Sequence, residues 1–176
     1  MRICTGLCVA ALLVAGAGAA AEPLRAGEAR RLLLLDFELI DEQAGVTPFP
    51  EAAARLAMAG ERLRERLGEA GIYAVLDDAP IADALLAARR ANLTLLDCKG
   101  CELDLARQLG AERVMLAWVQ RVSNLILNLN IEVRDVTTGR TLLNKSVDMR
   151  GNTDRSWRRA VDFVVRDMAD RGQHNR

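Results

Sequence analysis

A run of alternating apolar and polar residues lies in the second half of the chain, from Ser123 to Arg134. Its even positions carry amides and charges, with Ile126 as the one exception. Its odd positions after Ser123 are all apolar: Leu125, Leu127, Leu129, Ile131 and Val133. A period of two is the pattern of a strand with one buried face and one wet face. The sequence therefore predicts a half-buried β-strand here.

The tripeptide at 137–139, Thr-Thr-Gly, predicts a three-residue hairpin loop after this strand, because glycine readily takes the left-handed conformation such a loop needs. With this loop, Leu129 faces Val147 and the apolar side chains of both strands share one face. A two-residue loop would shift the pairing by one residue and set Leu129 against Asp148. Lys145 is the one charged residue that the favoured register leaves on the apolar face.

The same register gathers polar side chains on the opposite face of the two strands. Asparagine is a poor strand former, yet three asparagines fall within seven residues. We interpret them as fixed by hydrogen bonds to a partner or a ligand; the alternative is the wet side of an ordinary antiparallel sheet. The predicted interaction face consists of Asn124, Asn128, Asn130, Glu132, Asn144, Ser146, Asp148 and Arg150.

The remaining elements follow from hydrophobic periodicity and from proline and glycine positions. Strands are predicted at 31–37, 72–76 and 113–122, and helices at 50–70, 80–88 and 102–109, with a last helix that starts after Asn152 or Thr153. The buried stripe of that helix is Trp157, Val161, Val164 and Met168. Residues 38–49 and 92–99 are predicted loops. Asp78 is expected to cap the helix after it.

This order predicts a single α/β domain with α+β character over residues 31–171, followed by a tail at 172–176. We expect a mixed sheet of about five strands, because the first two strands need a crossover helix and the last three can form an antiparallel meander. The order is β-α-β-α-α-β-β-β-α, and the helices are expected chiefly on one face of the sheet.

The first 21 residues have the pattern of a secretory signal peptide. Arg2 precedes an apolar run over 7–17, and an Ala-Ala-Ala stretch ends at Ala21. The run is too short to span a bilayer, and no later stretch is long and apolar enough to do so. The apolar run is not followed by a cysteine, which is the residue that would carry a lipid anchor. The sequence therefore predicts cleavage near Ala21, a polar lead-in at 22–30 and export to the periplasm.

Charge argues against nucleic acid as a partner. Lys and Arg number 24, and so do Asp and Glu. Removal of the signal peptide takes away one arginine and no acid, so the mature chain has a slight negative excess. Phosphate backbones are bound by a basic surplus, which this chain lacks.

Two of the four cysteines, Cys98 and Cys101, remain after removal of the signal peptide, in the sequence C-K-G-C. In an oxidising compartment this spacing predicts a disulfide. A redox-active pair is the alternative, because the start of a helix lowers a thiol pKa, although Glu102 and Asp104 disfavour a thiolate. Covalent haem attachment needs a histidine where Glu102 stands, and zinc needs about four ligands.

Acidic residues follow the first two predicted strands: Asp36, Glu38, Asp77 and Asp78. Ligands of parallel sheets favour that edge, and clustered carboxylates suit a hard cation such as calcium. The alternative is a helix cap at Asp78 and solvated loop acids elsewhere.

Catalytic machinery of the common kinds is not found in the sequence. The only histidine, His174, lies in the tail, so a serine–histidine–acid set is not available, and no phosphate-binding glycine loop occurs. We therefore predict a protein that is not an enzyme and carries no cofactor. Residues 152–154 are expected to cap the last helix rather than to bind an anion.

Several segments resemble a family of small secreted bacterial domains of unknown function, above all WVQRVSNLILNLN and SVDMRGNTDRSW. The matching segments are 32–38, 71–77, 98–102, 105–111, 118–130 and 146–157. The strand order is also similar to that of the amino-terminal domain of TolB and of related envelope lipoproteins. That second resemblance implies a domain that assembles partners at the cell surface.

Taken together, the sequence predicts a periplasmic, non-enzymatic interaction or accessory module that presents a sheet edge or the asparagine face to an envelope protein. Residues 123–130 are candidates for an edge that pairs with another chain, including a second copy. Two alternatives stay open. One is a thiol–disulfide redox protein that uses Cys98 and Cys101, and the other is a small-ligand or metal-binding accessory to a periplasmic oxidoreductase.

Overall fold

The computed structural model of the protein describes residues 29–174. The predicted signal peptide and its cleavage site, residues 22–28 of the lead-in and the last two residues of the predicted tail lie outside this part. Among residues 29–174, no helix has the length and apolar character needed to cross a membrane.

Residues 29–174 form six strands, which make one mixed sheet, and four α-helices, which lie on both faces of that sheet. In chain order the elements are β1 (Arg30–Leu34), β2 (Glu38–Asp41), α1 (Ala52–Glu69), β3 (Tyr73–Val75), the short 3₁₀ helix η1 (Ala79–Ile81), α2 (Ala82–Ala91), α3 (Cys101–Leu109), β4 (Arg113–Arg121), β5 (Ile126–Asp135), β6 (Thr141–Arg150) and α4 (Asp154–His174). The strand order is β3-β1-β4-β5-β6, and β2 also pairs with β4. The predicted fold class and element order are confirmed, with one strand more than expected.

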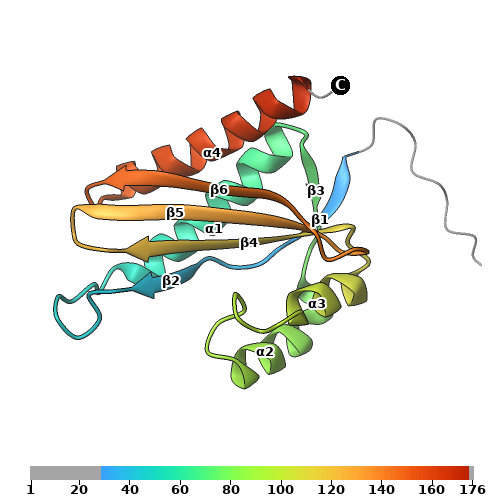
Figure 1. The fold of residues 1–176 in the computed structure, drawn as a ribbon, viewed down its shortest axis with the longest axis horizontal. Coiled ribbons are helices and arrows are strands. Elements are labelled where there is room, and N and C mark those ends of the chain that lie inside the picture. Colours follow the sequence, from blue (N-terminus) through green and yellow to red (C-terminus); the bar gives the residue numbers. More distant parts are fainter. Residues whose placement is uncertain (1–28, 175–176) are drawn as a thin grey trace, which may run out of the picture.

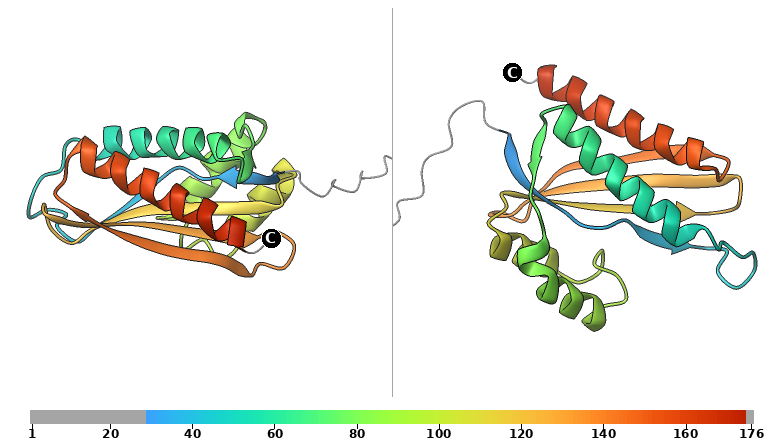
Figure 2. Two further views of the ribbon diagram at one scale, coloured as in Figure 1. Left: turned by 90° about the horizontal axis from the view of Figure 1, so that it is seen from above. Right: turned by 180° about the vertical axis from the view of Figure 1, so that it is seen from behind.

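Helices α1 and α4 lie together along one face of the sheet, whereas α2 and α3 cover only one end of the other face (Figures 1 and 2). Two apolar cores result. Leu32, Leu34 and the inner sides of β4 and β5 pack against α1 and α4. Leu33 and Leu35 pack against α2 and α3 on the opposite side. The expectation of helices chiefly on one face is therefore wrong for α2 and α3.

The apolar run after Arg31 forms β1, which is buried on both faces as predicted. The chain then leaves the sheet briefly and returns as β2, within residues that were predicted to be a loop. β2 pairs in parallel with the second half of β4, beyond the point where β1 ends. Its four residues, ELID, are too few and too mixed in polarity to show a period of two. The pairing with β4 therefore decides its conformation.

The register predicted for β5 and β6 is observed: Leu129 lies opposite Val147 and Asn128 opposite Asp148. Lys145, the one misfit on the apolar face, lies 2.6 Å from Asp167 of α4 and over the ring of Phe163. The charge is thus accommodated by the helix that covers this face.

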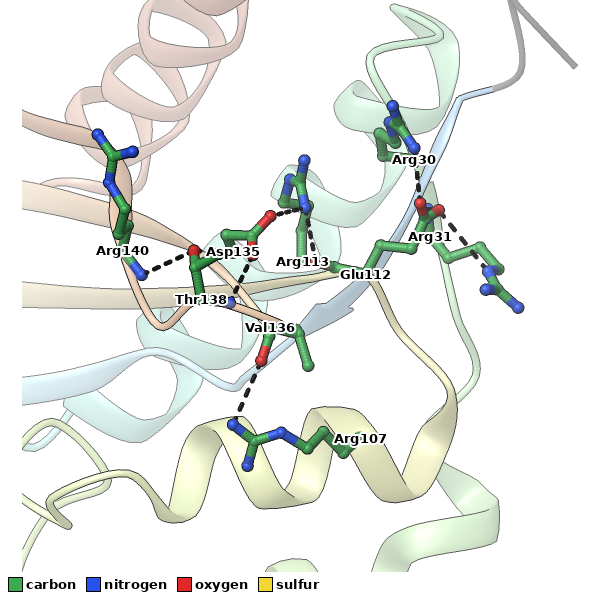
Figure 3. Close-up of polar contacts among 9 residues, drawn as sticks. All are labelled: Arg30, Arg31, Arg107, Glu112, Arg113, Asp135, Val136, Thr138 and Arg140. Carbon is green, nitrogen blue, oxygen red and sulfur yellow. Dashed lines mark hydrogen bonds and ion pairs between the residues drawn. The ribbon is translucent and has the colours of Figure 1, made fainter. Parts of the chain in front are cut away.

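The loop between β5 and β6 differs from the prediction. Asp135 N donates to Arg140 O at 2.9 Å, so four residues, not three, form the loop. Val136 turns into the α2–α3 core, where it is 4% exposed, and its carbonyl accepts from Arg107 (Figure 3). A bulge beside Thr141 restores the apolar register further along. Burial of Val136 therefore selects the longer loop.

Within residues 29–174, the free edge of the sheet on this side is β6, because β5 lies between β4 and β6. The expectation that residues 123–130 form an edge is therefore wrong. Residues 123–125 form a turn in which Ser123 Oγ accepts hydrogen bonds from the amides of Leu125 and Ile126. Alternation continued by chance into this turn and made the predicted strand three residues too long.

We expect the protein to lose stability in acid, because several carboxyl groups have a lowered pKa in the folded state. Hydrogen bonds from Thr138 lower the pKa of Asp135 (Figure 3), and the bond from Lys145 lowers that of Asp167. Stability from such groups is present above their unfolded pKa and is lost as pH falls through the lower folded pKa. Urea unfolding should thus give similar free energies at pH 7 and 5 and a smaller one below about pH 4. Equal values at pH 7 and 3 would contradict this expectation.

Candidate functional site

Part of the sheet face opposite α1 and α4 is covered by no helix of the described residues (Figure 1). The second half of β4, the first half of β5, and β2 and β6 beside them form this surface. Two rows of paired residues cross it. One row is Glu38, Trp118, Asn130 and Ser146, and the other is Ile40, Gln120, Asn128 and Asp148. We call these eight residues the open face.

Hydrogen bonds within the strands hold the two central asparagines of the open face. Asn130 is 8% exposed, and its amide nitrogen donates to Asn128 O at 3.2 Å. The side-chain nitrogen of Asn128 lies 2.9 Å from Asp148 Oδ1 when its amide is oriented to donate. These polar groups are thus held in place before any partner arrives.

Most of the predicted interaction residues do share this side of the sheet. Glu132 and Asn144 lie next to the open face as a cross-strand pair, and Arg150 ends β6. Asn124 does not belong to the set, because it lies in the turn before β5 and its side chain accepts from Arg121. The turn at 123–125 reverses the chain and directs Asn124 to the end of the sheet.

Trp118 and Gln120 were missed by the sequence interpretation, which treated β4 as covered on both faces. Both are half-buried, and they alternate with the buried Ala117 and Val119 of the α1–α4 core. Only the first half of β4 is covered by α3, where Leu116 is buried. In the sequence, the polar residue Gln120 was the one sign that the second half of β4 is not covered by a helix on this face.

Glu38 lies at the β2 side of the open face and ties a neighbouring loop to it. Its Oε1 accepts from the Leu95 amide at 2.7 Å, and its Oε2 is buried without a hydrogen-bond partner in the described part of the chain. The loop thereby borders the face, and Leu93 in this loop is fully exposed.

The four acids considered for a cation make separate contacts. Asp36 pairs with Arg89 at 2.6 Å, and Asp77 accepts from the Ala79 amide at 3.1 Å. Asp77 rather than Asp78 thus supplies the side-chain bond at the start of η1, where Asp78 makes no capping hydrogen bond. Within residues 29–174, only Cys98, Cys101 and Glu102 bring three potential metal-ligand atoms close together.

The sulfurs of Cys98 and Cys101 lie 2.01 Å apart, the length of a disulfide bond. Glu102, which follows, is 1% exposed. Its Oε2 accepts from the Gly100 amide at 3.1 Å, and its Oε1 lies 2.6 Å from Arg134 on β5. Glu102 therefore anchors the C-K-G-C loop to the sheet.

Arg134 continues this chain of contacts towards the border of the open face. Its Nε donates to Glu132 at 2.7 Å, and the Thr141 hydroxyl donates to the same carboxylate oxygen. Burial by itself raises the pKa of Glu132, but the bonds from Arg134 and Thr141 outweigh it and lower that pKa. The loop with the disulfide and the two strands of the meander are thereby linked.

A fully buried arginine closes the end of the sheet where β4 finishes. Arg121 is 0% exposed, lies 2.9 Å from Asp41 and donates to the Thr47 carbonyl at 2.9 Å. Its guanidinium also lies over the Phe49 ring, 5.1 Å from the centroid. Asn124 completes this set. The sequence interpretation missed Arg121, which joins the end of β2, the loop after β2 and the turn before β5, and is a structural centre rather than a binding group.

The start of α4 is capped by side chains, as predicted. The Ser156 amide donates to Thr153 Oγ1 at 3.2 Å, so Thr153 is the cap. Asn152 Oδ1 accepts from Trp157 Nε1 and from Arg55, both at 2.9 Å. Trp157 is buried in the core, as its position on the apolar stripe predicted.

The sequence matches one protein family over residues 30–168, from the first strand into α4. The chain belongs to the DUF3280 family. The family is described as "Protein of unknown function (DUF2380)", which confirms the expected membership in an uncharacterised family. No curated protein matches the sequence.

Solved structures with the fold of this DUF3280 domain come from several bacteria. The C-terminal domain of LpoB from Escherichia coli is 20% identical, with a TM-score of 0.51 over 73% of this chain and 86% of that one. Lipoprotein GNA1162 from Neisseria meningitidis is 18% identical, with a TM-score of 0.51 over 80% and 96%. The PelC dodecamer from Paraburkholderia phytofirmans is 15% identical, with a TM-score of 0.50 over 83% and 91%.

At these identities the likeness establishes a shared fold. GNA1162 confirms the predicted resemblance of the DUF3280 domain to a lipoprotein fold. TolB from Acinetobacter baumannii also matches, at 11% identity over 82% of this chain and 29% of TolB, with a TM-score of 0.46.

Proposed function

We propose that this protein is a non-enzymatic interaction module of the bacterial cell envelope, exported to the periplasm, and that it docks a partner protein on the open face. The observation that carries the proposal is the uncovered row with Trp118 at its centre. Large aromatic side chains at the middle of a polar surface are the usual anchors of protein interfaces. On the other side of the sheet, α1 and α4 cover the strands.

The polar groups around Trp118 support the same function. Asn128 and Asn130 are held by bonds within the sheet, so little side-chain freedom is lost when a partner covers them. Ile40 adds an apolar contact, because it is 39% exposed beside Gln120. The signal peptide predicted from the sequence and the bonded C-K-G-C pair suit the periplasm.

Site-specific photocrosslinking in living cells tests this function. A photoreactive residue is placed at Ser146 or Gln120 on the open face, and at the exposed Glu65 of α1 as the control on the opposite face. We expect one envelope protein to be captured from both open-face positions and not from Glu65. Trp118→Ala should abolish the capture while the protein remains folded by circular dichroism.

Equal capture from Glu65 and Ser146 would show that the open face is not the docking surface. If the crosslinked product contained only two copies of this chain, the open face would bind a second copy of the protein and not a different envelope protein. PelC, solved as a dodecamer with this fold, makes that outcome worth separating by mass spectrometry.

A further inference from the structure

Helix α4 runs beside β6 (Figures 1 and 2). A groove lies between the edge of β6 and this helix. Its volume is about 1030 Å³. β6 contributes residues 146–150, and α4 contributes Arg155, Arg159, Phe163 and Arg166. These four helix positions are four, four and three residues apart, so they form one stripe along α4. Phe163 is 44% exposed in the middle of this stripe.

The groove is positively charged, because its arginines have no acidic partners within residues 29–174. Arg150, Arg155, Arg159 and Arg166 occur in none of the ion pairs of this part of the chain. Eleven other arginines do form such pairs. Arg64, Arg90, Arg140 and Arg158 also lie outside these pairs, so half of the described arginines without an ion pair line this one groove.

The two acids that line the groove do not neutralise it. Asp162 is bound by Arg62 at 2.9 Å on the side of α1. Asp148 accepts from the side chain of Asn128 when that amide is oriented to donate, which fixes the carboxylate but leaves its charge. One carboxylate that is unpaired in this part of the chain, against four arginines, leaves the groove with a positive excess that is available to an external anion.

The backbone of β6 offers a row of hydrogen-bonding groups that pair with no other strand of the described residues. Gly151 N donates to Leu125 O at 2.9 Å, and Asp135 N donates to Arg140 O. In an antiparallel ladder, residue pairs that exchange backbone hydrogen bonds alternate with pairs that do not. In β5 and β6 the odd-numbered residues form the hydrogen-bonded pairs. Asn144, Ser146 and Asp148 therefore direct their amides and carbonyls away from the sheet. An edge of this kind is a template for another strand.

We propose that this groove binds an extended acidic peptide segment of a partner protein, which adds to β6 as a further strand and sets its carboxylates against the arginines of α4. The spacing fits. Alternate residues of a strand recur about every 6.7 Å, and side chains four residues apart on a helix lie roughly 6 Å apart along its axis. Acidic side chains on every second residue would thus meet Arg155 and Arg159 in turn. This site lies at the edge of the sheet beside α4; it shares Ser146 and Asp148 with the open face but does not include Trp118.

Fluorescence anisotropy with defined peptides tests this binding mode on the purified protein. The probe is a labelled ten-residue peptide of alternating Glu and Val, and its charge control is the same peptide with Lys in place of Glu. We expect the acidic peptide to bind, more weakly as salt rises, and the basic one not to bind. An acidic peptide N-methylated at the alternate residues whose amides would face β6 should lose binding, because it cannot complete the ladder with β6.

A set of variants assigns the charge contribution. The triple variant Arg155→Gln, Arg159→Gln, Arg166→Gln should weaken binding roughly tenfold, as the sum of three exposed ion pairs. The matched control is Arg158→Gln on the same helix, because Arg158 contacts Met58 of α1 instead of the groove. Circular dichroism checks that each variant is folded, which the exposed positions favour.

Three results would overturn the proposal: no binding of the acidic peptide, equal binding of the basic one, or full binding of the N-methylated one. If the triple variant bound the acidic peptide with unchanged affinity, the arginines of α4 would have no role in binding. Trp118→Ala should leave peptide binding intact, so failure of this site and failure of the open face can be told apart.

Discussion

Replacement of Asp41 by alanine is expected to lower the free energy of unfolding by about 3–5 kcal/mol, because it leaves a buried arginine without its counter-charge. Arg121 is 0% exposed, and Asp41 is its only acidic partner among the described residues. The guanidinium would keep the Thr47 carbonyl, Asn124 and the face of Phe49, none of which carries a charge. Its Nε already lacks a hydrogen-bond partner in this part of the chain.

Urea unfolding followed by circular dichroism measures this loss. Arg121→Met is the informative companion, because it removes the buried charge and leaves Asp41, which is 17% exposed and can gain water. We expect Arg121→Met to cost less than Asp41→Ala. Asp104→Ala is the surface control, since the exposed pair of Asp104 with Arg107 contributes below about 1 kcal/mol. A similar cost for Asp41→Ala and Asp104→Ala would show that Arg121 does not depend on its partner.

The β5–β6 register could be predicted because one face of the pair is buried and the other is not. A shift of one residue would have placed Leu129 against Asp148, so the apolar pattern permits one register only. The conformation of the hairpin tip could not be predicted from this pattern. Val136 packs into the core formed with α2 and α3, a contact with residues far away in the sequence. Local turn rules therefore gave a loop one residue too short.

Half of the candidate site could be found in the sequence, and half could not. Asn128, Asn130 and Asp148 come from strands whose alternation is plain. Trp118 comes from a strand that is apolar on both sides through Val119, although α3 covers only its first half. Which helix covers which strand depends on long-range packing, and β4 carries little local sign of it.

Arg121 shows the same limit for a structural centre. In the sequence it is one charged residue at the end of a strand, which is commonly exposed. Its burial depends on Asp41 and Thr47, which precede it by more than seventy residues. β2, which carries Asp41, was itself not predicted. An error in one short strand thus concealed the most buried ion pair at this end of the sheet.

The two tryptophans should differ sharply when each is replaced by alanine. Trp157 is 0% exposed, packs against Phe49 and donates from Nε1 to Asn152 at 2.9 Å. Its loss should cost about 3–5 kcal/mol. Trp118 is half-buried on the open face, so its replacement leaves a smaller cavity and should cost clearly less. Thermal unfolding of both variants by circular dichroism measures the difference.

Trp157→Phe separates packing from hydrogen bonding at the buried site. It keeps most of the ring volume, and Asn152 Oδ1 still accepts from Arg55, so most of the stability should return. If Trp118→Ala destabilised the protein as much as Trp157→Ala, Trp118 would act as a core residue, and loss of a partner in that variant would report unfolding. If only Trp157→Ala lowers the stability strongly, the indole of Trp118 contributes little to the free energy of folding. A docked partner is then the reason to keep a large aromatic side chain there.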